Sequence, residues 1–583
     1  MNKKRINDLL VTWCEALYSH ILTSQDKRID GAMICPACGK IHGRCFEAMY
    51  PFLEMARQSG DDKWIKASIK LFSWAEHTVT LPNGGYLNDI DSDWTGTSVF
   101  ECIAYLDVLF SYSDLLPKEF FEKLKERTFK LAKYILDNKA LRDKNTNYPV
   151  SAAYALYRAG KYFNNESFLS GSREFEEIIY SVFTPNYFVF GEGFGRDRRS
   201  DKNLLSIDIG YNVEETLPAI ALLGYEKKDE KLLALAEKGF LAHLKLFLSD
   251  GGWDNSFGTR DFKWTYWGSR TSDGAAEALL LLSERNPIFA HAAYRNIMLM
   301  EKCTHNGLLY GGLDLEKAGQ SPCIHHTFTH AKVLAGIIRR DIAKSIDTIS
   351  TDNFPRYSTL GLSYLNDADT YIYSSPIYSA TITAYDWPHM VGGHTSGGML
   401  SLLEIREKGP VIVSGMGRYY LKEKNNMQTP FGDIKHECPD FRIDNGIFSS
   451  RYSSDAVMNA SDNTISVEGV LTSETGEKDS PYSVRYEFND DKINISIKTN
   501  GELILPLANG SWQLISSLND SVQIAKDDSV LEIRRTDGGD IKYPYGCDKI
   551  LSLVPGILFL KTVMTAIEGC IDIEIRILKR RKG

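Results

Sequence analysis

The sequence of 583 residues lacks any apolar run approaching the roughly 18 residues that a transmembrane helix needs. It therefore predicts no membrane span. A secretory signal is also not indicated, because Asp8 and Glu15 interrupt the apolar part of the basic N-terminus and no small-residue cleavage site follows. The apolar spacing there predicts an amphipathic helix instead. We expect a cytoplasmic protein, or a periplasmic one if a signal was removed before the numbering begins.

Positive charge is not in excess, since 67 Lys and Arg residues stand against 76 Asp and Glu residues, for a net charge of −9. This balance argues against a nucleic-acid partner, because phosphate binding requires a basic field. An acidic substrate stays compatible with it, since a basic cleft can exist on an acidic protein. The ten cysteines are mostly scattered, which suits a reducing compartment better than a disulfide framework.

The chain has no strict internal repeat, but its hydrophobic periodicity changes once. From about residue 5 to 340, apolar residues recur every three or four positions, in paired segments separated by long polar and aromatic loops. That rhythm indicates antiparallel helical hairpins in a ring or stack. After about residue 345, apolar and polar residues alternate. We expect an α+β multidomain chain, with an (α/α) toroid catalytic domain over 1–345 followed by an antiparallel β-sandwich over 346–583.

The one cysteine group with meaningful spacing is CPACGKIHGRC. Cys35, Cys38, His42 and Cys45 offer three thiolates and an imidazole, the ligand types of zinc sites, at a spacing shorter than that of a standard zinc knuckle. The alternative is a turn with buried cysteines, in which His42 and Arg44 contact substrate. If a cofactor binds, we expect a divalent metal such as zinc and no organic cofactor.

Two predicted helix starts carry polar groups. Asn147 in NTNYP either caps its helix or hydrogen-bonds a substrate carboxylate. The stretch GYNVEET places Tyr211, Asn212 and two glutamates at a helix start, where carboxylates are favoured by the helix dipole alone. The tyrosine and the asparagine add reactive groups to that position. The glycine-rich GEGFG before it lacks the strand–turn–helix context of a nucleotide site.

The stretch WDNSFGTRDFKWTYWGSRTSDG crowds aromatic rings and cations between glycines. Tryptophan faces stack on sugar rings, and arginines pair with carboxylate or sulfate. So much donor capacity beside so much aromatic area indicates a ligand-binding loop, although docking on the β domain through the same aromatic rings is the alternative. The side chains expected to contact a ligand are Trp253, Asn255, Arg260, Lys263, Trp264, Tyr266, Trp267 and Arg270.

Histidines gather in two places. In CIHHTFTHAK, His326 and His330 are four residues apart and share one helix face, whereas His325 points elsewhere. A pair at this spacing can bind metal, but no glutamate of an HExxH motif accompanies it. His394 lies in a predicted loop at the start of the β domain that could reach over the helical cleft.

These candidates include no isolated pair of catalytic acids. They suit β-elimination at a uronic acid, which requires neutralising the C6 carboxylate, removing the C5 proton and protonating the departing O4. Asn, Arg or a metal can stabilise the charge, and His or Tyr can act as base and acid. We therefore expect an anionic oligo- or polysaccharide substrate. Its expected contacts are His42, Arg44, Asn212, Asn255, Arg260, Trp264, Trp267, Arg270, His325 and His394.

This architecture, with the blocks CPACGKIHGRC, DIGYNVEETLP, DNSFGTRDFKWTYWGSRTSDG and IHHTFTHAK, resembles the heparinase II/III-like polysaccharide lyases. The resemblance implies elimination at a uronic acid, in glycosaminoglycans or their oligosaccharides. It also implies roles for single residues, namely an acid at Tyr211 or Tyr266, a base at His326 or His330, and carboxylate ligands at Asn147, Asn255 and Arg270.

Two other functions fit parts of the sequence. A glycoside hydrolase acting on uronide oligosaccharides would need two carboxylates several ångströms apart, for which Asp208, Glu214, Glu215 and Asp254 are candidates. A non-catalytic glycan-binding protein would keep the tryptophans but would not need tyrosine and histidine in register. Formation of a C4–C5 double bond would distinguish a lyase from both.

Overall fold

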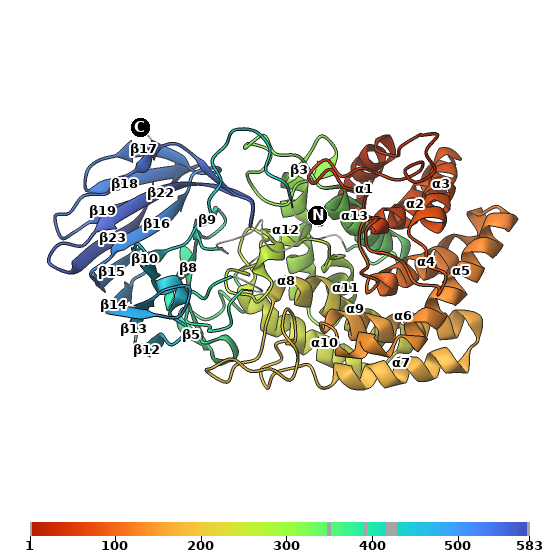
Figure 1. Ribbon diagram of the computed structural model, residues 1–583, viewed down its shortest axis with the longest axis horizontal. Helices are drawn as coiled ribbons and strands as arrows, with labels where there is room; N and C mark the ends of the chain where they lie inside the picture. Colours follow the sequence, from red (N-terminus) through yellow and green to blue (C-terminus); the bar gives the residue numbers. More distant parts are fainter. Residues whose placement is uncertain (1–2, 345, 347–350, 390–392, 416–427, 580–583) are drawn as a thin grey trace.

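The computed structural model describes residues 3–344, 346, 351–389, 393–415 and 428–579. Figure 1 shows a helical part, coloured red to green, beside a part built of strands, coloured blue-green to blue. The last helix ends at Arg339 and the first strand of the two large sheets begins at Gly361. The expected order of a helical domain followed by antiparallel sheets is confirmed.

The helical part consists of hairpins joined by long loops. Its helices are α1 (Lys3–Ser19), α2 (Met49–Ser59), α3 (Lys63–Thr78), α4 (Ser98–Tyr112), α5 (Lys118–Asp137), α6 (Asn147–Phe163), α7 (Glu166–Ile179), α8 (Ile209–Tyr211), α9 (Leu217–Lys227), α10 (Glu230–His243), α11 (Ala276–Leu282), α12 (Ile288–Lys302) and α13 (Ile324–Arg339).

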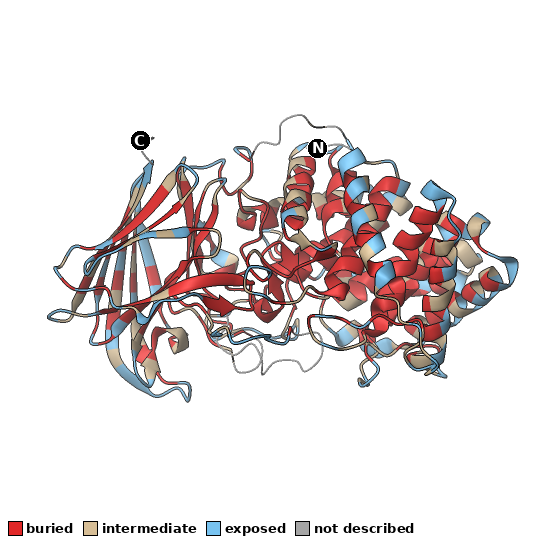
Figure 2. Ribbon diagram, turned by 90° about the horizontal axis from the view of Figure 1, so that it is seen from above, coloured by how far each residue is buried: buried red, intermediate tan, exposed pale blue. Residues whose placement is uncertain are grey.

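Six of these helices form a closed inner ring. In ring order they are α2, α4, α6, α9, α11 and α13, and α13 returns to α2. Each packs against an outer helix, and the pair α1 with α13 joins the start of the domain to its end. Inner helices are buried on all sides, as α13 is from Ile324 to Ile338, whereas the outer α5 buries one face. Figure 2 shows this contrast between red inner and pale outer helix faces.

The N-terminal segment is the amphipathic helix that its spacing predicts. Helix α1 buries one apolar stripe against the ring, which consists of Ile6, Leu9, Leu10, Trp13, Cys14 and Leu17. Among the described residues, the helices are all too short or too polar to cross a lipid bilayer.

The strands form two main antiparallel sheets. The first has the order β5-β6-β7-β8-β9, and the second runs β17-β18-β19-β23-β15-β14-β13-β11-β10-β16-β22-β21, with β12 beside β13. The strands of the first are β5 (Gly361–Leu365), β6 (Thr370–Ser374), β7 (Tyr378–Thr383), β8 (Met399–Ile405) and β9 (Gly409–Val413). Those of the second are β10 (Arg442–Asn445), β11 (Phe448–Ser449), β12 (Val457–Ser461), β13 (Thr464–Thr472), β14 (Lys478–Phe488), β15 (Lys492–Lys498), β16 (Glu502–Ala508), β17 (Gln513–Ser517), β18 (Ser521–Lys526), β19 (Ser529–Arg535), β20 (Pro544–Cys547), β21 (Ile550–Ser552), β22 (Ile557–Thr565) and β23 (Cys570–Lys579), of which β20 lies beside β22. Short hairpins β1 (Trp264–Thr265) with β2 (Gly268–Ser269) and β3 (Thr304–His305) with β4 (Leu308–Leu309) belong to the helical part.

The two sheets share one apolar core. Tyr373 of the first sheet stacks on Phe488 of the second, with ring centroids 4.5 Å apart. The hydroxyl of Tyr378 donates to the carbonyl of Asn489 at 2.7 Å. Strands such as β15 alternate buried apolar and outward polar side chains, as a sheet with one buried face requires.

Buried polar side chains join the helical part to the sheets. Arg356 is fully buried and donates to Ser379 and Thr381 of β7, and its guanidinium lies 3.4 Å from Asp254 of the helical part. Lys202 of the helical part donates to Asp369 at 2.7 Å across the same boundary. These contacts fix the sheets against one end of the helical ring.

Candidate active site

A cavity of about 580 Å³ opens where the N-terminal ends of the inner helices meet. Each ring helix contributes from its first turn or from the segment just before it. Helix N-termini present unpaired backbone N–H groups and partial positive charge, which favours an anionic ligand. The side chains and glycines that line the cavity are Arg44, Asn88, Asp89, Ser92, Trp94, Thr97, Phe100, Asp143, Lys144, Asn145, Asn147, Tyr148, Gly193, Phe194, Gly195, Tyr211, Glu215, Arg260, Lys263, Thr271 and His325.

Asn147 occupies the first turn of α6 and lines the cavity wall. Its side-chain nitrogen donates to Glu215 at 2.6 Å, and its backbone N–H donates to Glu192 at 2.8 Å. Its side-chain oxygen is buried and has no hydrogen-bond partner among the residues that the structure describes. Burial raises the pKa of Glu215 to about 8. The amide therefore keeps hydrogen-bonding capacity for a ligand in the cavity.

Tyr211 lies at the junction of α8 with a π-helical turn over 212–216. Its ring lies under the guanidinium of Arg260, whose carbon is 3.8 Å from the ring centroid. Its hydroxyl is 2.6 Å from the hydroxyl of Thr271. Burial raises the pKa of Tyr211 well above its ordinary value, although Arg260 opposes this. The phenol therefore stays protonated at neutral pH and can donate a proton.

His325 projects from the first turn of α13 into the same cavity. Both ring nitrogens are buried without a hydrogen-bond partner in the described part of the chain. The ring stacks on Phe328 at 4.8 Å between centroids and lies 5.1 Å from the ring of His42. Burial lowers the pKa of His325 well below its ordinary value. A neutral imidazole with free nitrogens can accept a proton.

Cations and aromatic rings complete the wall. The guanidinium of Arg260 pairs with Glu192 at 3.0 Å, and burial raises the pKa of that glutamate to about 7. Lys263 follows in the same loop and lines the cavity. Elsewhere on the wall, the rings of Trp94 and Tyr148 meet edge to face, with their centroids 5.6 Å apart. The cavity thus combines positive charge with flat apolar faces.

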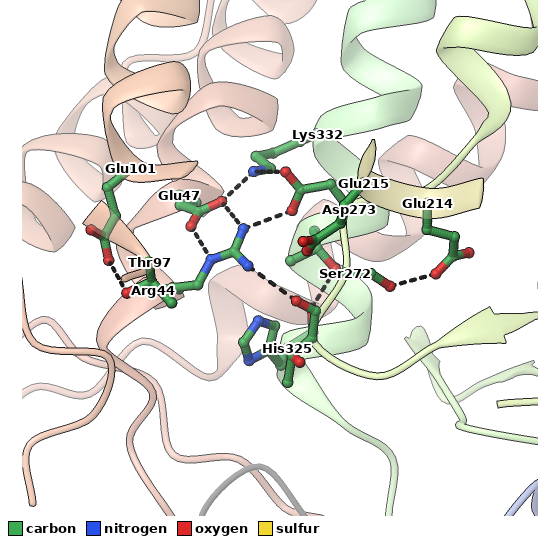
Figure 3. Close-up of polar contacts among 12 residues, drawn as sticks. Arg44, Glu47, Thr97, Glu101, Glu214, Glu215, Ser272, Asp273, His325 and Lys332 are labelled. Atoms are coloured by element: carbon green, nitrogen blue, oxygen red, sulfur yellow. Dashed lines mark hydrogen bonds and ion pairs between the residues drawn. The ribbon is translucent and has the colours of Figure 1, made fainter. Parts of the chain in front are cut away.

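A network of buried charges lies behind the cavity (Figure 3). The guanidinium of Arg44 pairs with Glu47, with Asp273 at 2.7 Å and with the carbonyl of Thr271 at 3.1 Å. Lys332 of α13 pairs with the same Glu47 and lies 3.1 Å from Asp273. Arg44 was expected to contact substrate, and it does line the cavity. Its donors, however, hold the Thr271 loop and α13 together.

The tryptophan stretch does not present sugar-stacking faces, contrary to expectation. Trp264 and Trp267 have no exposed surface. Their indole N–H groups donate to the carbonyls of Trp253 and Tyr310 at 2.9 and 2.8 Å. Tyr266 is equally buried and donates to Asp250 at 3.1 Å. Of this stretch, the cavity lining includes Arg260, Lys263 and Thr271.

The remaining expected contacts in this region are also structural. Asn255 donates to Asp208 at 3.0 Å and accepts from a backbone N–H of α8. Arg270 donates to the carbonyl of Leu553 in the β domain at 3.1 Å. The stretch therefore docks on the β domain through part of its polar groups, whereas the alternative interpretation expected docking through its aromatic rings.

Asn212 and His394 lie outside the cavity as well. Asn212 donates to the carbonyl of Val189 at 2.8 Å and lies 3.1 Å from the ring nitrogen of His243. His394 is buried with its ring nitrogen 2.8 Å from the carbonyl of Thr395. Neither side chain reaches the cavity wall.

The expected histidine pair faces away from the cavity. The ring of His330 lies 4.6 Å from that of Trp267 and 3.5 Å from Glu214, and His326 also meets Trp267 edge to face. Of the three histidines in this helix, the structure brings His325 to the cavity. The helical spacing correctly separated it from the pair, but it gave no sign of which face looks into the cavity.

Of the four carboxylates proposed for hydrolysis, Glu215 lines the cavity. Asp208 accepts from the backbone N–H of Tyr211, Asp254 accepts from Thr381, and Glu214 accepts from the backbone N–H of Ser269. Their expected pairing across a sugar is therefore wrong.

Sequence reasoning missed the aromatic side of the cavity. Trp94 and Phe194 line it from loops that the sequence marks only as polar or rich in Gly, and Tyr148 lines it from the first turn of α6. A partly exposed tryptophan in the otherwise polar segment DIDSDWTG was the available signal.

The cysteine group also differs from expectation. Cys35, Cys38 and His42 bring one ligand atom each within 4.8 Å of one another. Cys45 is not part of this group, because it lies in a short 3₁₀ helix with its thiol near the backbone of Met33. His42 was also expected to bind substrate, but it is buried against Asp89 and Cys38.

Known proteins of two kinds match this chain. The family model of the ulvan lyase N-terminal domain matches residues 10–354, and that of the ulvan lyase C-terminal domain matches residues 362–579. A broad-specificity ulvan lyase of Formosa agariphila is 32% identical over 581 residues, which cover 95% of this chain and 90% of that protein.

Among solved structures, the chondroitin AC lyase of Streptomyces coelicolor A3 matches with a TM-score of 0.52 at 10% identity, over 98% of this chain and 79% of that one. The heparan sulfate lyase HepC of Pedobacter heparinus matches with a TM-score of 0.46 at 12% identity, over 92% of this chain and 76% of that one. The first of these likenesses shows a shared fold, and the sequence matches decide the family. The chain belongs to the ulvan lyase family and is a polysaccharide lyase.

Proposed function

We propose that this lyase cleaves a uronic-acid-containing polysaccharide by β-elimination in the cavity at the N-terminal ends of the ring helices. The observation that supports this proposal is the convergence of Asn147, Tyr211 and His325 on one cavity whose wall carries Arg260 and Lys263. An amide, a phenol, an imidazole and two cations are the groups that the reaction requires, in one place.

The substrate carboxylate is neutralised by Asn147, Arg260 and Lys263. One N–H of the Asn147 amide is taken by Glu215, which leaves the second for a carboxylate oxygen. The positive ends of α6 and α13 add to the same field. Stabilising the enolate-like charge lowers the barrier to removal of the C5 proton, which is otherwise a weak acid.

His325 is the base and Tyr211 is the acid. The imidazole takes the C5 proton on a nitrogen that is hydrogen-bonded to none of the described residues. The phenol of Tyr211 gives its proton to the departing O4, and the guanidinium above its ring stabilises the resulting phenolate. The products are a new reducing end and a sugar with a C4–C5 double bond. The acid is therefore assigned to Tyr211 rather than to the buried Tyr266.

Ulvan is the substrate that we propose, because the relative from Formosa agariphila is an ulvan lyase and the sequence match covers nearly its whole length. Trp94 and Tyr148 supply the apolar faces for sugar rings that the sequence analysis placed in the tryptophan stretch.

Incubation with separate polysaccharides tests the proposal. We expect the ultraviolet absorbance of the conjugated C4–C5 double bond to rise in the reaction with ulvan. Heparin, hyaluronan, chondroitin and alginate are incubated in parallel for comparison. The rise should match the release of reducing ends. Reducing ends without this absorbance would exclude elimination, and elimination confined to a different polymer would exclude ulvan.

A further inference from the structure

The CPACGKIH segment folds into a tight hairpin that gathers soft metal ligands. The backbone N–H of Gly39 donates to the carbonyl of Cys35 at 2.8 Å, and that of Cys35 donates to Lys40 at 2.8 Å. Gly39 adopts a positive φ of 67°, which lets the chain turn back at once. The thiol of Cys38 then lies 3.3 Å from Nε2 of His42.

A fourth ligand candidate, the thiol of Cys323, reaches this hairpin from the other end of the helical domain. Sγ of Cys323 lies 3.7 Å from Sγ of Cys35, although 288 residues separate them in sequence. With zinc–sulfur bonds of about 2.3 Å, two thiolates of a tetrahedral zinc site lie about 3.8 Å apart. The separation between these two sulfurs therefore matches one edge of such a site.

The histidine is held as metal-ligating histidines are. Nδ1 of His42 lies 3.0 Å from Oδ1 of Asp89, and both side chains are almost fully buried. A carboxylate on one ring nitrogen fixes the tautomer and turns the other nitrogen toward the metal. Here that other nitrogen faces Cys38.

We propose that Cys35, Cys38, His42 and Cys323 bind one structural zinc ion. The first three offer ligand atoms within 4.8 Å of one another. Cys323 contacts Cys35 but lies outside that close group, so its side chain would turn toward the ion to supply the fourth ligand. Cys323 replaces Cys45 in the ligand set expected from sequence spacing. Four protein ligands leave no open position, so the ion is structural rather than catalytic.

The zinc ion would join the first loop of the chain to the helix that carries the proposed base. Cys323 is the residue just before α13, and His325 follows two positions later. The rings of His42 and His325 lie 5.1 Å apart. The ion therefore positions the first turn of α13, a role in catalysis that rests on the proposed function.

Metal analysis of the full-length enzyme tests the site without any substrate. We expect the purified protein to retain stoichiometric zinc after dialysis against metal-free buffer. Cys35→Ser and His42→Ala should lose it, and Cys323→Ser should bind it more weakly. Cys45→Ser is the matched control and should keep the full amount. His42→Cys should retain zinc where His42→Ala does not, and Asp89→Asn should weaken zinc affinity about 10–100-fold.

If the variants fail to fold, cobalt substitution of the wild-type enzyme tests whether thiolates bind the metal. Bound cobalt should give an intense thiolate charge-transfer band, which a site of carboxylates or imidazoles alone does not give. A zinc-free wild-type protein without that band would overturn the site. Loss of metal in Cys45→Ser but not in Cys323→Ser would overturn the ligand set.

The positioning role has a separate readout. Enzyme stripped of zinc that keeps its circular dichroism spectrum should show a lower kcat with little change in KM. An unchanged kcat would refute positioning while leaving the metal site intact. If the zinc-loaded wild-type enzyme shows no elimination at all, the proposed function fails and the zinc stoichiometry still stands.

Discussion

At the scale of single residues, the side chains of the cavity differ from their buried neighbours in what their polar atoms bind. Asn147 and His325 keep buried polar atoms that no described residue hydrogen-bonds, whereas Tyr266 donates to Asp250. A buried polar atom without a partner costs about 1–3 kcal/mol. Such a cost is tolerated where a ligand supplies the missing hydrogen bond.

Replacing tyrosines tests which phenol is the acid. Tyr211→Phe is expected to lower kcat about 10²–10⁴-fold, because the proton for the leaving oxygen is lost while the ring still packs under Arg260. Tyr266→Phe is the matched control and should change kcat little, at a stability cost of about 1 kcal/mol. Initial rates of double-bond formation measure both. Activity lost in the second variant and kept in the first would refute the assignment.

His243 makes stability depend on pH. Burial lowers the pKa of this residue to about 4, against about 6.5 in an unfolded chain. Between those values the unfolded chain binds a proton that the folded chain does not, so stability falls as pH drops from 6.5 toward 4. At pH 5 the expected loss is about 2 kcal/mol relative to pH 7.

The variant His243→Gln should not show this component of the pH dependence. Its free energy of unfolding in urea should therefore fall about 2 kcal/mol less between pH 7 and pH 5 than that of the wild type. Equal losses in the two proteins would show that His243 does not titrate in this range.

At the scale of elements, periodicity predicted the helical hairpins because outer helices such as α5 bury one face only. It could not choose among the histidines of α13, because that helix is buried on every side from Ile324 to Ile338. A pattern of apolar residues shows which face of a helix is buried only where the opposite face is exposed to solvent. The pair His326 and His330 drew attention by spacing, and both rings lie against Trp267.

Replacing histidines of α13 tests the base. His325→Gln is expected to lower kcat about 10²–10⁴-fold, since no other imidazole lines the cavity as the described residues form it. His330→Gln sits one turn away on the same helix and should keep kcat while lowering the melting temperature. Rates and thermal unfolding, measured together, separate the two effects. A His330 variant that is folded but inactive would reverse the assignment.

The tryptophan stretch shows what composition does not reveal. Aromatic rings with cations fit both a ligand-binding wall and a buried loop, and the difference lies in where each N–H donates. Trp264 donates to the carbonyl of Trp253 within the same stretch, and Trp267 donates to that of Tyr310 outside it. Those carbonyls are placed by tertiary structure, so the sequence alone favoured the wrong face of this loop while correctly including Arg260 in the cavity.

At the scale of the whole molecule, the change of period from 3.6 to 2 was sufficient to predict the order of the two parts. The cavity was not predictable as a unit, because seven segments from residue 44 to residue 325 form it. The cavity lies where it does because the ring helices run in the same direction, and the sequence does not reveal that shared direction. Individual members such as Asn147 and Tyr211 were recognisable because each begins a helix with an unusual polar group.

Arg356 is the buried cation between the two parts of the molecule. It faces Asp254 at 3.4 Å and Glu404 at 3.8 Å, and all three side chains are inaccessible to water. Arg356→Met leaves two buried carboxylates without their cation, which should cost about 3–5 kcal/mol of unfolding free energy. Arg485→Met removes an exposed pair with Glu487 and should cost about 1 kcal/mol or less.

Urea unfolding followed by fluorescence measures both arginine variants. Similar small losses in the two proteins would mean that Arg356 does not join the helical part to the sheets.

The packing of α1 on α13 has a consequence for the order in which this protein is made. Helix α1 leaves the ribosome before α13, so its apolar stripe has to wait for α13, whose residues are synthesised some three hundred positions later. During that interval the stripe is exposed, as in other large domains whose early segments lack their final partners. Nascent chains that end before α13 should therefore need chaperones, and those that end just after it should not.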